Sequence, residues 1–140
     1  MSEARLGSGG PWEQAFGYSR AVRVGSRILV SGCTSTRDGV VHFPSDPAAQ
    51  LRLAAETALA AVSELGGTLD DVVLTRLYVT HRRDCEAIGR AHGELFGAVR
   101  PVATMVVVAG LLHPDMRVEI EVEAVVGAAT SLPRPEQAPV

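Results

Sequence analysis

Apolar and polar residues alternate most regularly in the stretch VEIEVEAV, residues 118–125. In an extended strand, successive side chains point to opposite faces, so this pattern separates an apolar face from an acidic one. The apolar face collects Val118, Ile120, Val122 and Ala124, and the other face collects Glu119, Glu121 and Glu123. The pattern predicts a strand with one buried face and three neighbouring carboxylates on the other.

Similar patterns predict four further strands. SRAVRVG (residues 19–25) and RILVSG (residues 27–32) are two short strands joined by a turn at Gly25-Ser26, and Asp38-Gly39 marks another turn. Residues 71–80 and 104–109 are rich in β-branched side chains, as strands commonly are.

Two segments have the 3.6-residue spacing of helices. The first begins with an Asp46 cap and Pro47, and it ends at Gly66-Gly67. Its apolar positions are Leu51, Ala54, Ala55, Ala58, Val62 and Leu65. The second helix is predicted over residues 83–96, with Gly97 as its end.

The predicted element order is β-β-α-β-α-β-β, which indicates an α+β fold with one sheet and two helices on one face. The second face would stay uncovered, and residues 105–108 are apolar on consecutive positions, so we expect this face to be covered by oligomerisation. Residues 11–128 are predicted to form a single domain, flanked by flexible tails at residues 1–10 and 129–140.

Composition narrows the class of protein. The chain has 140 residues and a formal net charge of −3, so its field would repel a nucleic acid backbone. The longest apolar run, residues 105–112, is too short to cross a bilayer, and the N-terminus lacks the apolar core of a signal peptide. Cys33 and Cys85 have no metal-binding or CxxC spacing. We expect a cytoplasmic protein without metal, membrane or nucleic acid partners.

Several separated motifs resemble one known family. They are GYSRAVRVGSRILVSG, LGGTLDDVVLTRLYVT, AHGELFG, RPVATMVVV and VEIEVEAV, and together they span residues 17–126. In this order they resemble the reactive intermediate deaminase (Rid) family, also described as YjgF-like or endoribonuclease L-PSP. The resemblance implies a chorismate-mutase-like α+β fold and a homotrimer with a central β-barrel. It also implies three clefts between subunits, in which imines or enamines are hydrolysed to a keto acid and ammonia without cofactor or metal.

The resemblance assigns several site residues. Glu119, the first glutamate of VEIE, matches the family's proton-relaying carboxylate. Tyr18 matches a tyrosine of the cleft, and Ser31 and Gly32 match the loop after the second strand. Cys33 follows them directly, either as a nucleophile or as a small buried side chain.

The substrate anchor is where this sequence departs from the family. Family deaminases carry an arginine two residues after the proline of an RPARS-like motif, where it holds the substrate carboxylate. Here the motif is RPVATM, so Ala103 occupies that position and Thr104 follows it. Hydrolysis of 2-aminoacrylate is therefore less expected, and Arg20 and Arg100 are the alternative anchors.

Two further residues have two open interpretations each. His113 lies in a proline-containing loop that either reaches the cleft or is only exposed. Trp12, the only tryptophan, either packs over the barrel or covers a bound ligand. His92 is interpreted as structural. Glu121 and Glu123 either line a wet surface between subunits or pair with arginines such as Arg76 or Arg117.

Taken together, these residues predict a Rid-family enzyme that acts on a small imine, enamine or related carbonyl compound. The reaction would be hydrolytic deamination, tautomerisation or cyclisation, with Glu119 as general acid and base. The alternative is a non-catalytic binder of small molecules that uses the same cleft. Ribonuclease activity is disfavoured by the acidic charge balance.

Overall fold

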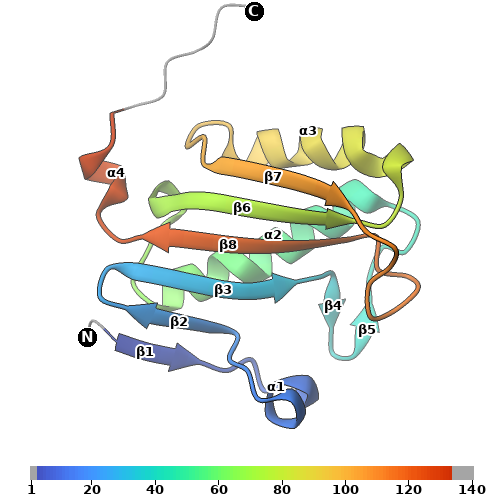
Figure 1. Cartoon of the computed structure of the whole chain (residues 1–140), viewed down its shortest axis with the longest axis horizontal. Helices are drawn as coiled ribbons and strands as arrows, with labels where there is room; N and C mark the ends of the chain where they lie inside the picture. The colour runs from blue at the N-terminus through green and yellow to red at the C-terminus, as the bar shows by residue number, and fades with distance from the viewer. Residues whose placement is uncertain (1–2, 134–140) are drawn as a thin grey trace, which may run out of the picture.

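A six-stranded sheet organises the chain in a computed structural model that describes residues 3–133. The strand order is β1-β2-β3-β8-β6-β7 (Figure 1), in which β7 runs parallel to β6 and all other neighbours are antiparallel. The strands are β1 (Glu3–Leu6), β2 (Ala21–Val24), β3 (Arg27–Cys33), β6 (Val72–Val79), β7 (Val102–Val107) and β8 (Val118–Val125). This arrangement agrees with the predicted α+β class.

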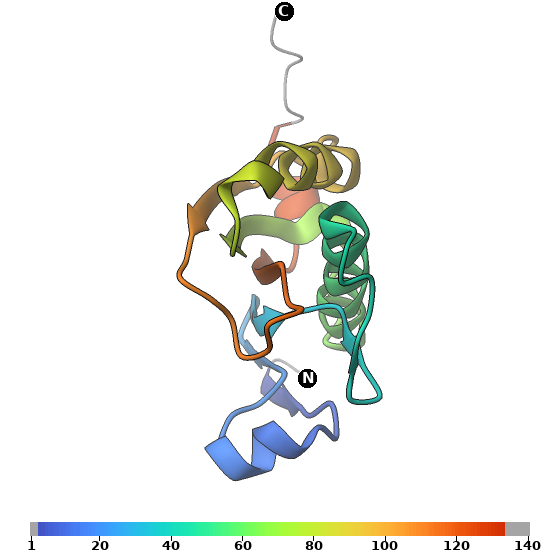
Figure 2. The same ribbon diagram turned by 90° about the vertical axis from the view of Figure 1, so that its right-hand side faces the viewer.

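The helices are α1 (Pro11–Phe16), α2 (Pro47–Glu64), α3 (Cys85–Phe96) and α4 (Ala128–Ser131). Short 3-10 turns occupy Leu69–Asp71 and Arg82–Asp84, and a small hairpin is formed by β4 (Thr36–Arg37) and β5 (Val40–Val41). The prediction of two long helices on one face is confirmed, because α2 and α3 lie together on the same side of the sheet (Figure 2).

Helix α2 begins and ends where the sequence predicts. The Asp46 carboxylate accepts a hydrogen bond from the Ala49 N–H at 3.1 Å, and Pro47 needs no N–H partner at the first helical position. Gly66 follows the helix with a φ of 93°, a left-handed conformation that glycine adopts without steric cost.

The core lies between the helices and one face of the sheet. The apolar members of strand β8 are all buried, and Ile120 and Val122 are 0% exposed. They meet the predicted inner positions of α2, which are also buried: Leu51, Ala54, Ala55, Ala58, Val62 and Leu65. Small aliphatic side chains thus fill most of the core, in keeping with an aromatic content of only 4%.

The opposite face of the sheet carries no helix within residues 3–133 (Figure 2). Cross-strand partners point to the same face. One row across this open face therefore runs through Val22, Leu29, Glu123, Leu74 and Val102. Four of its five members are apolar, and Val102 is 67% exposed at the edge strand.

Some boundaries differ from the predictions. Residues 3–6 were expected in a flexible tail but pair with β2 as strand β1. Helix α1, with Pro11 at its start, was also not predicted. Strand β7 begins two residues before the expected 104. Within the expected C-terminal tail, helix α4 is held because Asp71 accepts hydrogen bonds from the N–H groups of residues 127 and 129. Residues 134–140 of that tail lie outside the described residues.

Among the helices of residues 3–133, we find none with the length and apolar character required to cross a membrane.

Candidate active site

A β-bulge in strand β3 creates the local geometry of the site. Val30 pairs with Val122 and Cys33 pairs with Ile120, so two residues of β3 lie opposite a single residue of β8 between these pairs. Such a bulge bends the strand and changes the direction of its side chains and peptide groups. It places Ser31 and Gly32 beside the start of β8, at the end of the sheet next to α1 (Figure 1).

Gly32 allows the Glu119 carboxyl group to approach the backbone of the bulge. A Cβ atom added to Gly32 would lie 2.4 Å from Glu119 Oε2 and 2.7 Å from Glu119 Cδ. These separations are shorter than any van der Waals contact, so only glycine leaves room for the carboxyl group in this position. The structure therefore brings together Glu119 and Gly32, two residues that the sequence assigned to the same site.

Arg20 holds the bulge from the neighbouring strand. Its Nη1 donates to the Gly32 carbonyl at 2.8 Å, to Ser31 Oγ at 3.1 Å and to the Ser31 carbonyl at 3.3 Å. The same nitrogen lies 3.2 Å from Cys33 Sγ. In the other direction, the Ser31 N–H and hydroxyl donate to the Arg20 carbonyl. The guanidinium is consequently fixed against the residues that surround Glu119.

Glu119 is partly buried, and its environment favours the protonated acid. Burial raises the pKa of this carboxyl above its ordinary value, the neighbouring Glu121 carboxylate raises it further, and Arg20 acts in the opposite direction. A carboxyl group of this kind holds a proton at higher pH than an exposed glutamate does. It can therefore both donate and accept a proton closer to neutral pH.

Cys33 lies beneath this cluster, on the core face of the sheet. Its side chain is 1% exposed, and burial raises the pKa of the thiol to about 11. A thiol with this pKa stays protonated near neutral pH, whereas a nucleophilic cysteine reacts as the thiolate. The structure thus favours the interpretation of Cys33 as a small buried side chain, and it places the sulfur behind the bulge instead of at an open surface.

The other two carboxylates of strand β8 have partners on the open face. Tyr78 donates its hydroxyl to Glu121, whose carboxylate also lies 3.5 Å from Arg76. Glu123 lies 3.3 Å from Arg27 and 3.9 Å from Arg76. The expected pairing with Arg76 is confirmed.

The expected pairing of these carboxylates with Arg117 is wrong. Arg117 instead forms a two-pronged ion pair with Asp84, in which the closest nitrogen and oxygen are 2.7 Å apart. Its backbone N–H donates to the buried side chain of Gln50, which in turn donates to the Asp115 carbonyl. Arg117 therefore fixes the loop before β8 and contributes nothing to the carboxylate face.

His113 lies in that same loop. Its Nδ1 accepts a hydrogen bond from the Asp115 N–H at 3.0 Å, and its side chain is 50% exposed. No hydrogen bond within residues 3–133 joins it to Glu119 or to Arg20. In a single chain, the imidazole of His113 therefore has its hydrogen bond within its own loop and not with the Glu119 cluster.

Trp12 and Tyr18 are exposed aromatic residues at either end of α1. Trp12 stacks on Phe16 with ring centroids 4.9 Å apart, and it is 55% exposed. Tyr18 is 42% exposed and follows Gly17, which ends α1 with a φ of 75°. Tyr18 lies two residues before Arg20, whose side chain contacts the bulge.

Ala103 and Thr104 lie on the edge strand β7 and point to different faces. Ala103 pairs with Thr75, whose hydroxyl contacts His92 Nε2 at 2.8 Å on the helix-covered side. Thr104 pairs with Arg76 on the open face. Glu119 also lies two strands away, in the row of Tyr78, so one chain does not bring Ala103 to Glu119.

His92 has a structural environment. Its contact with the Thr75 hydroxyl supports the interpretation of His92 as a structural residue, and burial lowers the pKa of its imidazole.

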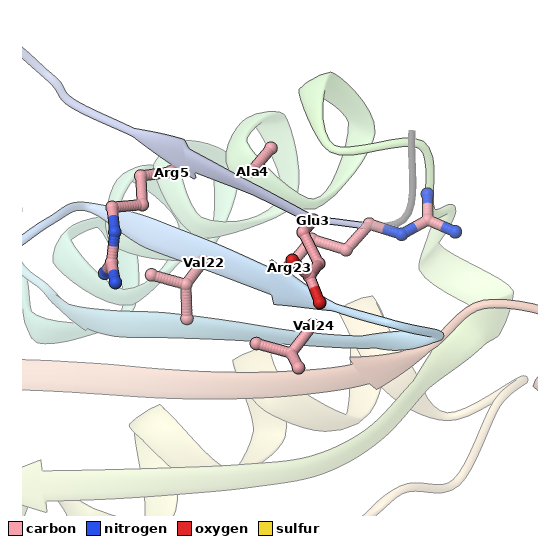
Figure 3. Close-up of a pocket in the computed structure, with 6 residues that line it drawn as sticks. All are labelled: Glu3, Ala4, Arg5, Val22, Arg23 and Val24. Carbon is pink, nitrogen blue, oxygen red and sulfur yellow. The ribbon is translucent and has the colours of Figure 1, made fainter.

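Two surface cavities lie elsewhere. One of about 560 Å³ is bordered by strands β1 and β2, where Glu3, Arg5, Val22 and Val24 line it from the open face (Figure 3). The other, of about 740 Å³, is lined in part by Arg100 and by helix α4. Neither is lined by Glu119. Residues 3–133 contain no group of three side chains arranged to hold a metal ion.

Arg20 is the site residue whose importance the sequence analysis underestimated. The predicted turn at Gly25-Ser26 sets a hairpin register in which Ala21 pairs with Val30. Continuing that register by one residue places Arg20 opposite Ser31. The predicted hairpin therefore implies that Arg20 lies opposite Ser31. It does not predict the bulge, which brings three acceptors to the Arg20 guanidinium.

Comparison with known proteins agrees with this fold. The family model described as endoribonuclease L-PSP matches residues 12–126. An uncharacterised protein of Streptomyces coelicolor, SCO2049, is 43% identical over 127 residues, which cover 91% of this chain and 95% of that protein.

Solved structures give the same result. The crystal structure of Rv2704 from Mycobacterium tuberculosis, a member of the YjgF/YER057c/UK114 family, is 42% identical with a TM-score of 0.81 and covers 89% of this chain and 100% of that one. E. coli TdcF with bound serine is 28% identical with a TM-score of 0.72, covering 86% of this chain and 92% of that one. The chain therefore belongs to the endoribonuclease L-PSP family, the YjgF/UK114 group that its motifs resemble.

Proposed function

We propose that this protein is an enzyme that hydrolyses small imines or enamines, with Glu119 as general acid and base. Family membership supports a function directed at small molecules. The observation that carries the proposal further is the position of the Glu119 carboxyl, which is partly buried against Gly32 with its pKa raised by burial. A carboxyl group in this environment is suited to moving protons in both directions.

The reaction follows from what a single carboxyl group can do. Glu119 as the carboxylate takes a proton from water while the water oxygen bonds to the carbon of the protonated imine, which gives a tetrahedral amino alcohol. The resulting acid returns this proton to the amine nitrogen, and the carboxylate then takes the hydroxyl proton as the C–N bond breaks. The carbonyl compound leaves, and ammonia takes the last proton from Glu119 and leaves as ammonium. For an enamine, the same carboxyl first protonates the carbon to form the imine. These steps need no cofactor.

We further propose that the active unit is a homotrimer with the site in a cleft between subunits. The apolar residues of the open sheet face support an assembly, since a single chain leaves them uncovered. Neither of the two cavities described above is lined by Glu119, which agrees with a site that a second subunit completes. Ala103, Thr104 and His113 would then reach the cleft from the neighbouring subunit. The free cysteines Cys33 and Cys85 support a cytoplasmic location.

The test is turnover of freshly generated imines of 2-oxo acids by wild type, Glu119→Gln and Glu123→Gln. We expect Glu119→Gln to lower kcat/KM by about 100-fold or more, the size of a general acid-base contribution. Glu123→Gln is the matched control, because it removes a carboxylate from the same strand and the same face. Light scattering of all three proteins should give the mass of three 14.7 kDa chains.

Equal turnover in wild type and Glu119→Gln would refute the assigned mechanism. A wild type that binds the compounds but never exceeds the buffer rate would favour a non-catalytic binder instead. A molecular mass of one chain in light scattering would show a monomer and would refute the proposed cleft between subunits.

A further inference from the structure

The guanidinium of Arg20 has two different sides. Its Nη1 is fully engaged with acceptors of the bulge, the closest being the Gly32 carbonyl at 2.8 Å. Its Nε is buried without a hydrogen-bond partner within residues 3–133. Its Nη2 also donates to no acceptor in that part of the chain, and it is not among the atoms enclosed by protein. One amino group of Arg20 is therefore held in place, and the other has no hydrogen-bond partner within residues 3–133.

Arg20 and Glu119 meet at the same residue of the bulge. The guanidinium donates to the Gly32 carbonyl and the Glu119 carboxyl group lies against the Cα of Gly32, so the cation and the general acid-base group occupy the same small region of one chain. The bulge contacts restrict the guanidinium to one orientation, and a group fixed before binding loses little entropy when it takes up an anion. Planar guanidinium N–H groups match the geometry of a carboxylate.

We propose that Arg20 takes the place of the anchor missing at residue 103 and binds the carboxylate of the substrate through its Nη2. The anchor and the general acid-base group would then come from the same chain, although residue 103 provides no cation. This inference rests on the proposed function, whose reacting carbon would lie between Arg20 and Glu119.

The competing explanation is that Arg20 only supports the bulge. Both roles predict that losing Arg20 harms activity, so activity alone does not separate them. The two roles can be separated by changing the charge of the ligand. Loss of an anchor weakens binding of a carboxylate but not of its neutral amide, whereas loss of a purely structural arginine weakens binding of both ligands equally. Pyruvate and pyruvamide are such a pair, nearly equal in shape and different in charge.

The experiment is an NMR titration of the full-length chain with pyruvate and, separately, with pyruvamide. The variants are Arg20→Gln, which keeps a polar amide donor and removes the charge, and Arg23→Gln as matched control. Arg23 lies on the same strand and also donates to backbone carbonyls, those of Gly25 and Leu65. We expect Arg20→Gln to weaken pyruvate binding by about 10-fold to 100-fold, the usual loss of a charged hydrogen bond, and to leave pyruvamide binding unchanged. Arg23→Gln should change neither affinity.

Equal losses for both ligands, or no loss for pyruvate, would overturn the inference, as would a wild type that binds neither ligand. If Arg20→Gln does not fold, the wild type gives the answer through the Arg20 Nε–H signal, which burial protects from exchange with water. This signal should shift with pyruvate and stay in place with pyruvamide; an unmoved signal at saturating pyruvate refutes the anchor. These readouts measure binding, so they remain decisive even if Glu119→Gln shows that the proposed reaction is wrong.

Discussion

Glu119 and Glu121 are two residues apart on strand β8 and point to the same face, yet their surroundings differ. Glu121 accepts the Tyr78 hydroxyl and lies 3.5 Å from Arg76, so it has direct partners on an exposed part of the sheet. Glu119 makes no comparable ion pair within residues 3–133 and lies against the backbone of Gly32. The environment, not the residue type, separates a paired carboxylate from one whose proton affinity is raised.

The difference originates in both neighbouring strands. On β6, Arg76 is the cross-strand partner of Glu121, and the hydroxyl of Tyr78 also reaches the Glu121 carboxylate. On β3, the bulge lies opposite Glu121 in register, and its Gly32 leaves room for the carboxyl group of Glu119, which is partly buried there. The pKa of Glu119 is thus raised where an irregular neighbour without a side chain accommodates its carboxyl group.

The largest effect on this comparison should come from adding a methyl group at Gly32. In Gly32→Ala, the new Cβ would lie 2.4 Å from Glu119 Oε2, so the carboxyl must move away from its position. We expect turnover of the imine substrates to fall by about 100-fold, since displacements near 1 Å have costs of this size. Gly93→Ala is the control, because a Cβ at Gly93 meets no atom within 4 Å. Equal activity of Gly32→Ala and wild type would show that the close approach has no catalytic role.

A second, moderate effect should appear in the pH profile of Glu121→Gln. The Glu121 carboxylate raises the pKa of Glu119, so its removal should move that pKa down. The limb of kcat/KM that reports ionisation of Glu119 then shifts to lower pH. The same change should lower the pKa of Tyr78, which is raised chiefly by its hydrogen bond to Glu121, as an ultraviolet titration of the phenol would detect. Glu123 is not a cause of the Glu119 shift, so a profile that moves equally in Glu123→Gln would contradict this assignment.

The smallest effect concerns stability. The pKa of Glu119 is raised above its ordinary value of 4.5 in the folded chain, so its ionisation opposes folding. Its favourable contribution is complete below about pH 4.5 and is lost as pH rises through the folded pKa. The Tm of Glu119→Gln relative to wild type should therefore increase between about pH 4.5 and neutral pH. The Tm of both proteins is measured by calorimetry. A Tm difference between Glu119→Gln and wild type that stays constant over this pH range would show that burial does not raise the pKa of Glu119.

Much of the fold follows from local patterns. The alternation in residues 118–125 predicts which side chains of β8 are buried, and the caps of α2 set its limits within one or two residues. Strand β1 escaped prediction because EARL is short and has little apolar character, and it forms only through pairing with β2. The loop before β8 was similarly out of reach, since Gln50 and Asp84 hold it from distant parts of the chain.

Some residues of the candidate site could likewise be predicted from the sequence, whereas others could not. Motif resemblance identified Glu119, Ser31 and Gly32, but it described Arg20 only as a possible anchor and paired Glu121 or Glu123 with Arg117 as readily as with Arg76. Arg117 was excluded by its ion pair with Asp84, a contact between residues 33 positions apart.

The sequence by itself determined the element order, the buried face of β8 and the family, because periodicity, caps and turns are local properties of the chain. Only the tertiary structure decided that Arg20, Gly32 and Glu119 meet at one end of the sheet. That meeting depends on a bulge, and the register of neighbouring strands is the result of pairing over long separations, not of any single stretch of residues.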